Sequence, residues 1–191
     1  MKPLRIGVLA VQGNFREHAQ MLRRLGAEVV EVRKAEELEG LDGLVIPGGE
    51  STTMTLGVER EGLAGPLREV AAGGVPLFGS CAGLIMLDRD HLGLLDIAAE
   101  RNAFGRQIRS FEADVELAGI DGGPMRAIFI RAPQIAEHGP GVEIIGAVDG
   151  HAIAARAGRV LAVAFHAELG DDDRLHRLFL DWCREPAVAT G

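Results

Sequence analysis

Two groups of residues in this sequence have the types and spacing that nucleophilic catalysis needs. Cys81 lies in the pattern G-x-C-x-G, and this is the thiol counterpart of the G-x-S-x-G turn that presents a nucleophilic serine. His166 lies far downstream and is followed two residues later by Glu168. A histidine can deprotonate a thiol while a carboxylate orients the imidazole, so these side chains together predict a Cys–His–Glu triad.

The segments on either side of Cys81 predict a sharp turn from a strand into a helix. Residues 75–78 form a short apolar run typical of a buried strand, and residues 84–87 begin a helix. The flanking glycines allow neighbouring backbones to pass close to the turn, and a helix N-terminus favours a thiolate and a developing oxyanion. A cysteine taken alone is more often a small buried residue. The glycines and the strand-to-helix context favour the nucleophile.

A glycine-rich segment follows another predicted strand, at residues 43–46, and has the sequence PGGESTT over residues 47–53. The two glycines let the backbone approach a ligand and expose N–H groups, and Ser51 or Thr52 is expected to cap the next helix. An ordinary strand-to-helix turn is the alternative interpretation. A phosphate-binding loop is disfavoured because no Gly-Lys-Ser/Thr follows.

Arginines gather at Arg101, Arg106 and Arg109, and Arg131 lies at the end of a predicted strand. Such a cluster is usually a solvated face, but guanidinium groups also suit carboxylate recognition, and the sequence leaves both interpretations open. The remaining histidines have no setting like that of His166. We therefore predict no role for His18, His91, His138, His151 or His176.

The composition is that of a globular protein with one large core. The chain has 191 residues, 47% of them hydrophobic and 25% charged, and we expect a single domain over residues 1–191. The formal net charge of −8 argues against nucleic acid or an anionic membrane as the main partner. The sequence has neither an apolar run long enough to span a membrane nor a signal peptide, and neither CxxC nor HExxH, so we expect no metal. Two distant cysteines predict reduced thiols and a cytoplasmic protein.

The order of the predicted elements indicates an α/β fold. Strands at 4–11, 29–32 and 43–46, with a helix after the first, predict an open mixed, mostly parallel sheet with helices on both faces. Asn14 is expected to cap that helix, with Glu17 as its capping-box partner. Binding sites in such sheets lie at the carboxyl ends of the strands. Later strands, some antiparallel, are predicted at 113–117, 127–130, 142–148, 152–155 and 160–165, before a last helix at about 173–183.

Several stretches spread along the chain carry a family resemblance. They include residues 6–13 (IGVLAVQG), 43–54 (GLVIPGGESTTM), 101–107 (RNAFGRQ), 129–133 (FIRAP) and 165–169 (FHAEL). With the Gly-Ser-Cys-Ala-Gly motif, they make the sequence resemble the class I, triad-type glutamine amidotransferases. Within that group the chain is most similar to the glutaminase subunits of pyridoxal 5′-phosphate synthase. The resemblance implies the flavodoxin-like fold of that class.

The resemblance also implies an activity, a partner and a set of site residues. The implied reaction is hydrolysis of L-glutamine to L-glutamate and ammonia through a thioester on Cys81, with no bound cofactor. The ammonia would pass to a synthase subunit that makes pyridoxal 5′-phosphate, which is vitamin B6 biosynthesis. His166 and Glu168 would complete the triad, and the backbone N–H groups of Gly49 and Ala82 would receive the oxyanion. The implied glutamine contacts are Gly49, Glu50, Ser51, Arg101, Ile130 and Arg131.

Two other functions stay open at this point. A cysteine-containing hydrolase of the stress-response or protease-like kind shares this type of sheet, although the GGES and RNAFGRQ stretches speak against it. A non-catalytic regulatory binding module is the other alternative. That alternative predicts a missing triad member, whereas Cys81, His166 and Glu168 are all present.

Overall fold

The computed structural model describes residues 2–105 and 110–186, and within them one seven-stranded sheet runs through the molecule in the order β2-β1-β3-β4-β11-β10-β9. Neighbouring strands from β2 to β11 are parallel, whereas β10 and β9 continue the sheet antiparallel. The predicted mixed, mostly parallel sheet is therefore confirmed. The strands are β1 (Arg5–Leu9), β2 (Glu28–Val32), β3 (Gly43–Ile46), β4 (Leu77–Ser80), β9 (Glu143–Val148), β10 (His151–Ala157) and β11 (Val160–Val163).

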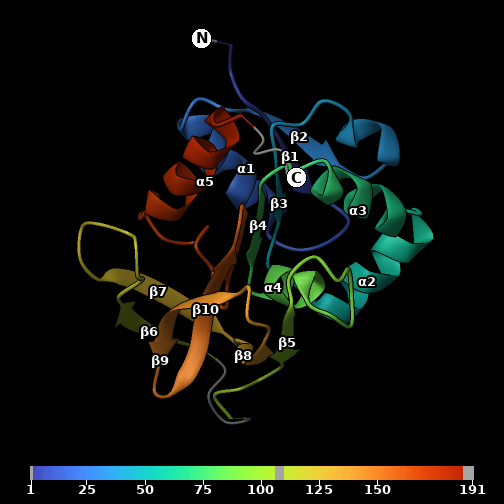
Figure 1. Ribbon diagram of the computed structural model, residues 1–191. Coiled ribbons are helices and arrows are strands. Elements are labelled where there is room, and N and C mark those ends of the chain that lie inside the picture. The colour runs from blue at the N-terminus through green and yellow to red at the C-terminus, as the bar shows by residue number, and fades with distance from the viewer. Residues whose placement is uncertain (1, 106–109, 187–191) are drawn as a thin grey trace.

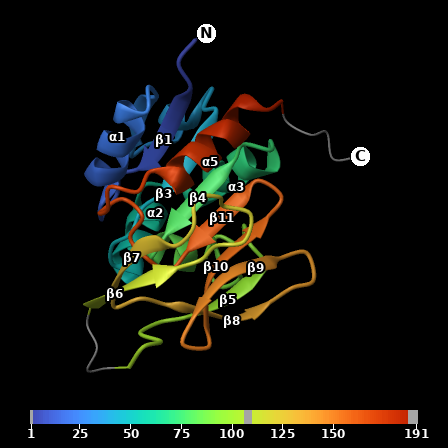
Figure 2. The ribbon, with the colours of Figure 1, turned by 90° about the vertical axis from the view of Figure 1, so that its left-hand side faces the viewer.

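Helices cover both faces of this sheet (Figures 1 and 2). On one face lie α1 (Phe15–Arg24) and α5 (Arg174–Arg184), and on the other lie α2 (Ser51–Arg60), α3 (Ala64–Ala72) and α4 (Ala82–Leu87). A short 3-10 helix, η1 (Ala35–Leu38), precedes β3. All four residues of β3 are buried, as expected for a parallel strand covered on both faces. None of the helices in the described ranges is long and apolar enough to cross a membrane.

Two small antiparallel sheets lie beside β9 and β10 (Figure 2). One pairs β5 (Ile97–Glu100) with β8 (Gln134–His138), and the other pairs β6 (Ser110–Val115) with β7 (Met125–Ile130). An aromatic cluster joins β6 and β7 to the main sheet: Phe129 stacks on Phe111 at 4.6 Å between ring centroids and contacts Phe165 at 5.6 Å. Neither β5 nor β8 is predicted from the sequence.

The carboxyl ends of β1, β3, β4 and β11 meet at one edge of the sheet, because these strands are parallel neighbours. Asn14, Glu50, Cys81 and His166 each follow one of these strands within a few residues. These residues therefore lie together at the edge where open α/β sheets bind ligands.

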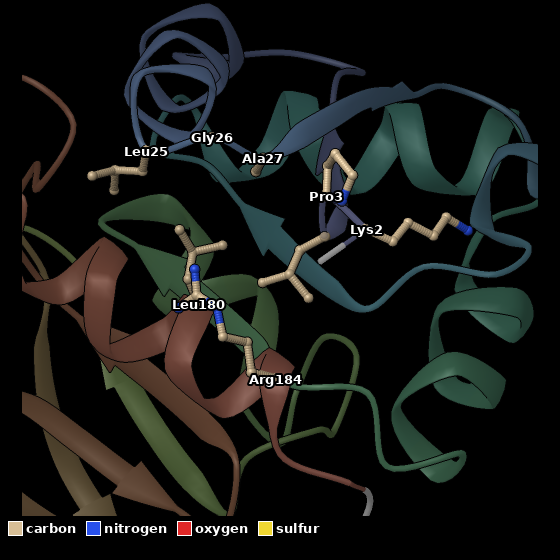
Figure 3. A pocket seen from close by; sticks show the side chains of 8 residues that line it. Lys2, Pro3, Leu25, Gly26, Ala27, Leu180 and Arg184 are labelled. Atoms are coloured by element: carbon tan, nitrogen blue, oxygen red, sulfur yellow. The ribbon is translucent and has the colours of Figure 1, made fainter.

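A hollow of about 220 Å³ lies at the opposite edge of the sheet, where β1 begins (Figure 3). Leu4, Leu25 and Leu180 line it together with two cations, Lys2 and Arg184. Its described lining residues include no cysteine, histidine or carboxylate, so the hollow offers no nucleophile or acid–base group.

Candidate active site

Cys81 lies at the turn between β4 and α4 in a left-handed backbone conformation, with φ 50° and ψ −109°. Such a conformation costs a non-glycine residue about 1–3 kcal/mol and persists only where its surroundings enforce it. A Cβ atom on Gly79 would lie 2.7 Å from the carbonyl oxygen of Gly83, and one on Gly83 would overlap the carbonyl oxygen of Ile46. The prediction that both flanking glycines are required by close backbone approach is confirmed.

His166 lies just beyond β11 and faces Cys81, and its Nδ1 atom is 2.7 Å from Oε1 of Glu168. Burial by itself would lower the pKa of His166, but hydrogen bonds to Cys81 and Glu168 outweigh burial and raise this pKa to about 10. The imidazole is therefore held as a cation between the sulfur of Cys81 and the carboxylate of Glu168. The structure brings all three predicted triad residues together.

Glu168 is buried directly behind His166, and four polar side chains surround its carboxylate. Oε1 contacts His166 and also accepts a hydrogen bond from Nδ2 of Asn14 at 3.1 Å. Oε2 lies 3.3 Å from the hydroxyl of Ser80 and 3.3 Å from Nε2 of His18. Burial raises the pKa of Glu168, but hydrogen bonds from His18 and His166 and the charge of His166 outweigh it and hold this pKa far below its usual range. The carboxyl group is therefore ionised.

The side chain of Asn14 has a different partner from the one predicted. Asn14 does precede α1, but its amide nitrogen lies 3.1 Å from Oε1 of Glu168 and 3.3 Å from Nδ1 of His166. The predicted capping box with Glu17 is wrong, because the amide instead satisfies the buried carboxylate. A short-range cap pattern cannot reveal a contact with residues about 150 positions away.

A pocket of about 470 Å³ opens in front of Cys81. Its lining includes every predicted site residue except Glu168, which lies behind His166: Gly49, Glu50, Ser51, Cys81, Ala82, Arg101, Ile130, Arg131 and His166. It also includes residues that the sequence analysis missed, namely Gln12, Asn14, Ile85, Asn102 and Pro133. Gln12, Asn102 and Pro133 lie within the stretches that carry the family resemblance, but their local sequence does not show that they line a pocket, because they enter it only when distant segments are folded together.

Glu50 caps α2, in place of the predicted Ser51 or Thr52. Its carboxylate accepts hydrogen bonds from the backbone N–H groups of Thr52 and Thr53 at 3.1 and 2.8 Å. These bonds lower the pKa of Glu50, and the bond from Thr53 has the larger effect. The hydroxyls of Ser51 and Thr52 are free to accept hydrogen bonds from Arg101 instead.

Of the predicted arginine cluster, Arg101 lines the pocket, whereas Arg106 and Arg109 lie outside the described residues. Nη2 of Arg101 is 2.9 Å from Oγ1 of Thr52, so the hydroxyls of α2 hold the guanidinium at the pocket wall. Arg131 follows β7 in a left-handed conformation, with φ 43°, and also lines the pocket. Two arginine residues therefore line the pocket that contains the thiol.

The backbone around Gly48 and Gly49 is held tightly against the nucleophile. A Cβ atom on Gly48 would lie 2.6 Å from Cε1 of His166 and 3.3 Å from Cβ of Cys81. The carbonyl of Gly48 accepts a hydrogen bond from the backbone N–H of Asn14 at 2.8 Å, which fixes the orientation of the Gly48–Gly49 peptide. This segment is a strand-to-helix turn between β3 and α2, and Gly49, Glu50 and Ser51 within it also line the pocket.

Comparison with known proteins places the chain among glutamine amidotransferases. Residues 8–185 match the model of the SNO glutamine amidotransferase family. "Pyridoxal 5′-phosphate synthase subunit PdxT" of Geobacillus kaustophilus is 50% identical over 98% of this chain and 99% of its own length. The PdxT subunit of Acidothermus cellulolyticus is 54% identical over 92% of each chain.

Solved structures show the same relationship. A crystal structure described as a glutamine amidotransferase superposes with a TM-score of 0.87 and 46% identity, over 93% of this chain and 98% of that one. PurLQS from Thermotoga maritima has a TM-score of 0.77 at 18% identity over 96% of this chain and all of that one, which shows the shared fold alone. The family match over residues 8–185, with relatives of 50–54% identity over 92–99% of their length, establishes that this chain belongs to the SNO glutamine amidotransferase family.

Proposed function

We propose that this chain is the glutaminase subunit of a pyridoxal 5′-phosphate synthase, and that it hydrolyses L-glutamine to L-glutamate and ammonia. The observation that carries the proposal is the strained Cys81 at the floor of the pocket, in contact with a buried His166–Glu168 pair. Relatives of about 50% identity are named as the PdxT subunit of that synthase. We further propose that residues 1–191 act as one glutaminase domain, in the cytoplasm, where Cys81 and Cys183 stay free as they are here.

The proposed reaction follows from the position of each group. The Cys81 thiolate attacks the side-chain amide carbon of glutamine, and the imidazolium of His166 protonates the amide nitrogen as ammonia leaves. Water then gives a proton to the neutral His166 and attacks the γ-glutamyl thioester, which releases glutamate and restores the thiolate. Glu168 stays ionised throughout and stabilises the imidazolium. The backbone N–H groups of Gly49 and Ala82 are proposed as the donors to the oxyanion.

The two pocket arginines are proposed to bind the α-carboxylate of glutamine, with Gly49, Glu50, Ser51 and Ile130 forming the rest of the substrate site. A guanidinium and a carboxylate form charge-assisted bonds worth about 1.5–3 kcal/mol each. Arg101→Ala or Arg131→Ala should therefore raise KM by roughly tenfold or more, as measured by initial rates of glutamate release. Arg60→Ala, at an exposed arginine of α2, is the matched control and should leave KM unchanged. Unchanged KM in both pocket variants would refute this role.

The ammonia is proposed to pass to the synthase subunit, and docking of that subunit is proposed to act on the Gly48–Gly49 peptide. A glycine peptide can turn either its C=O or its N–H toward the pocket. Turning it here breaks the bond between the Gly48 carbonyl and the N–H of Asn14. One oxyanion donor is worth about 2.7–4 kcal/mol of transition-state stabilisation, or roughly 10²–10³ in kcat.

We therefore expect the chain alone to be a poor glutaminase and the synthase subunit to raise kcat far more than it changes KM. The experiment that tests the proposed function is steady-state glutamate release by the chain alone and with saturating synthase subunit. Gly49→Ala should bind glutamine yet resist activation, because its Cβ would overlap Oε1 of Gln12 and lie 2.8 Å from Cα of Gly13. Equal kcat with and without the synthase subunit would disprove the coupling, and no glutamate in either case would disprove the function.

A further inference from the structure

Three polar side chains form a buried group behind the triad, although the sequence assigns a role to none of them. His18 comes from α1, His176 from α5 and Ser80 from the end of β4, and all three are 0% exposed. Nδ1 of His18 is 2.9 Å from Nε2 of His176, and Nε2 of His18 is 2.8 Å from the Ser80 hydroxyl. The same Nε2 atom lies 3.3 Å from Oε2 of Glu168. The group therefore joins helices on one face of the sheet to the catalytic carboxylate.

The direction of these hydrogen bonds follows from the far end of the group. Burial lowers the pKa of His176 to about 3, so its ring is neutral. Its Nδ1 atom is buried and has no hydrogen-bond partner among the described residues. A bare acceptor nitrogen is tolerated there more readily than an orphaned N–H donor, which places the proton of His176 on Nε2. His176 then donates to Nδ1 of His18, and His18 carries its own proton on Nε2, toward Ser80 and Glu168.

We propose that His18 is a positioning residue for the glutaminase reaction: oriented by His176, its Nε2–H acts with the Ser80 hydroxyl to hold Oε2 of Glu168, so that Oε1 is presented to His166. This inference rests on the proposed function and states how the carboxylate of Glu168 is kept in place. Each oxygen of Glu168 has its own pair of partners, since Oε1 contacts His166 and Asn14 and Oε2 contacts His18 and Ser80.

The packing around His18 explains why this side chain can position the carboxylate. Its ring lies edge-on to Phe78 at 5.8 Å between centroids and 5.1 Å from the ring of His176. Glu168 itself lies in the irregular segment between β11 and α5, where no helix or strand fixes its backbone. Without its two donors, Oε2 would be left buried and unpaired, and the carboxylate would be free to rotate away from His166.

The test compares two replacements of His18 in the full chain assayed with its synthase subunit. His18→Leu removes the donor, whereas His18→Gln keeps an N–H donor at a similar distance from the backbone. We expect His18→Leu to lower kcat about 10- to 100-fold with KM changed less than about twofold, and His18→Gln to recover most of the loss. Leu22→Ala, on the same face of α1, is the control, because it should lower the melting temperature without lowering kcat.

A second pair of variants decides the question if His18→Leu fails to fold. Ser80→Ala removes the hydroxyl and should lower kcat, whereas Ser80→Thr keeps the hydroxyl and should not. Where His18→Leu does fold, a double-mutant cycle with Ser80→Ala should be strongly non-additive, because both variants act on the same carboxylate oxygen. A kcat within twofold of wild type for His18→Leu, or equal impairment by leucine and glutamine, would overturn the proposal.

A readout that needs no turnover separates this inference from the proposed function. In the chain alone, the His166 Nδ1–H proton that is hydrogen-bonded to Glu168 should give a low-field proton resonance in NMR spectra. This resonance should survive in His18→Gln and shift or broaden in His18→Leu. An unchanged resonance in His18→Leu would overturn the positioning role even if wild-type chain released no glutamate. If the wild-type chain is inactive with its synthase subunit, but the resonance shifts or broadens as expected in His18→Leu, only the proposed function would be overturned.

Discussion

Cys81→Ala should abolish glutamate release while leaving the fold intact. The variant removes the sulfur that is proposed to form the thioester, and removal of a nucleophile that acts as part of a triad costs on the order of 10⁵–10⁶ in kcat. The substitution is small, and the loss should appear in the presence of saturating synthase subunit with an unchanged melting temperature. Cys183→Ala, at the other buried cysteine, should keep full activity. Substantial turnover by Cys81→Ala would exclude the covalent mechanism.

The same assignment can be checked chemically with a glutamine-mimicking electrophile. Cys81 faces the pocket and His166, whereas Cys183 lies in the core, so closely packed that a Cβ on Gly43 would overlap its sulfur. Burial raises the pKa of Cys183 to about 12, so its thiol stays protonated and unreactive at neutral pH. Peptide mapping should therefore find the label on Cys81, and a label mainly on Cys183 would be incompatible with the site described here.

Glu168→Gln should lower kcat about 10³–10⁴-fold with little change in KM. The four groups around this side chain all approach it as donors, two at each oxygen. Whichever way a glutamine amide is turned, its NH₂ group faces donors on one side. His166 loses its counter-charge in both orientations, and it loses its hydrogen-bond acceptor as well when the NH₂ group faces it. Rates should be measured with the synthase subunit present, and Glu59→Gln, at an exposed position on α2, is the matched control. A loss below tenfold would contradict the role of Glu168.

The main sheet and the strand-to-helix turn at Cys81 were predictable because their sequence signals are local. The runs at β1, β3, β4 and β11 are almost wholly apolar, and only a strand covered on both faces needs that pattern. The glycines around Cys81 mark a close backbone approach whatever the rest of the chain does. Strands β5 and β8 escaped prediction because they are short, partly exposed edge pairs without a clear alternation of apolar residues.

The supporting residues of the site could not be predicted, because their roles depend on contacts between distant segments. Asn14 matches a helix cap in its local sequence, and only the folded chain brings Glu168 within reach of its amide. His18 and His176 lie on the buried faces of two helices, where an isolated histidine usually has only a packing role. Glu50 caps α2 in place of Ser51 or Thr52, because a carboxylate at a helix N-terminus can accept hydrogen bonds from two N–H groups at once.

The position of β11 has a consequence for when the enzyme becomes active during synthesis. Among the described residues this strand is the last in sequence, yet it lies between β4 and β10 in the interior of the sheet. His166 and Glu168 follow it directly, whereas Cys81 leaves the ribosome some 85 residues earlier. A nascent chain can thus form the first parallel strands and the turn at Cys81 without being able to hydrolyse glutamine. In the proposed mechanism the thiol acquires its base only when β11 inserts, so glutaminase activity should begin with completion of the sheet.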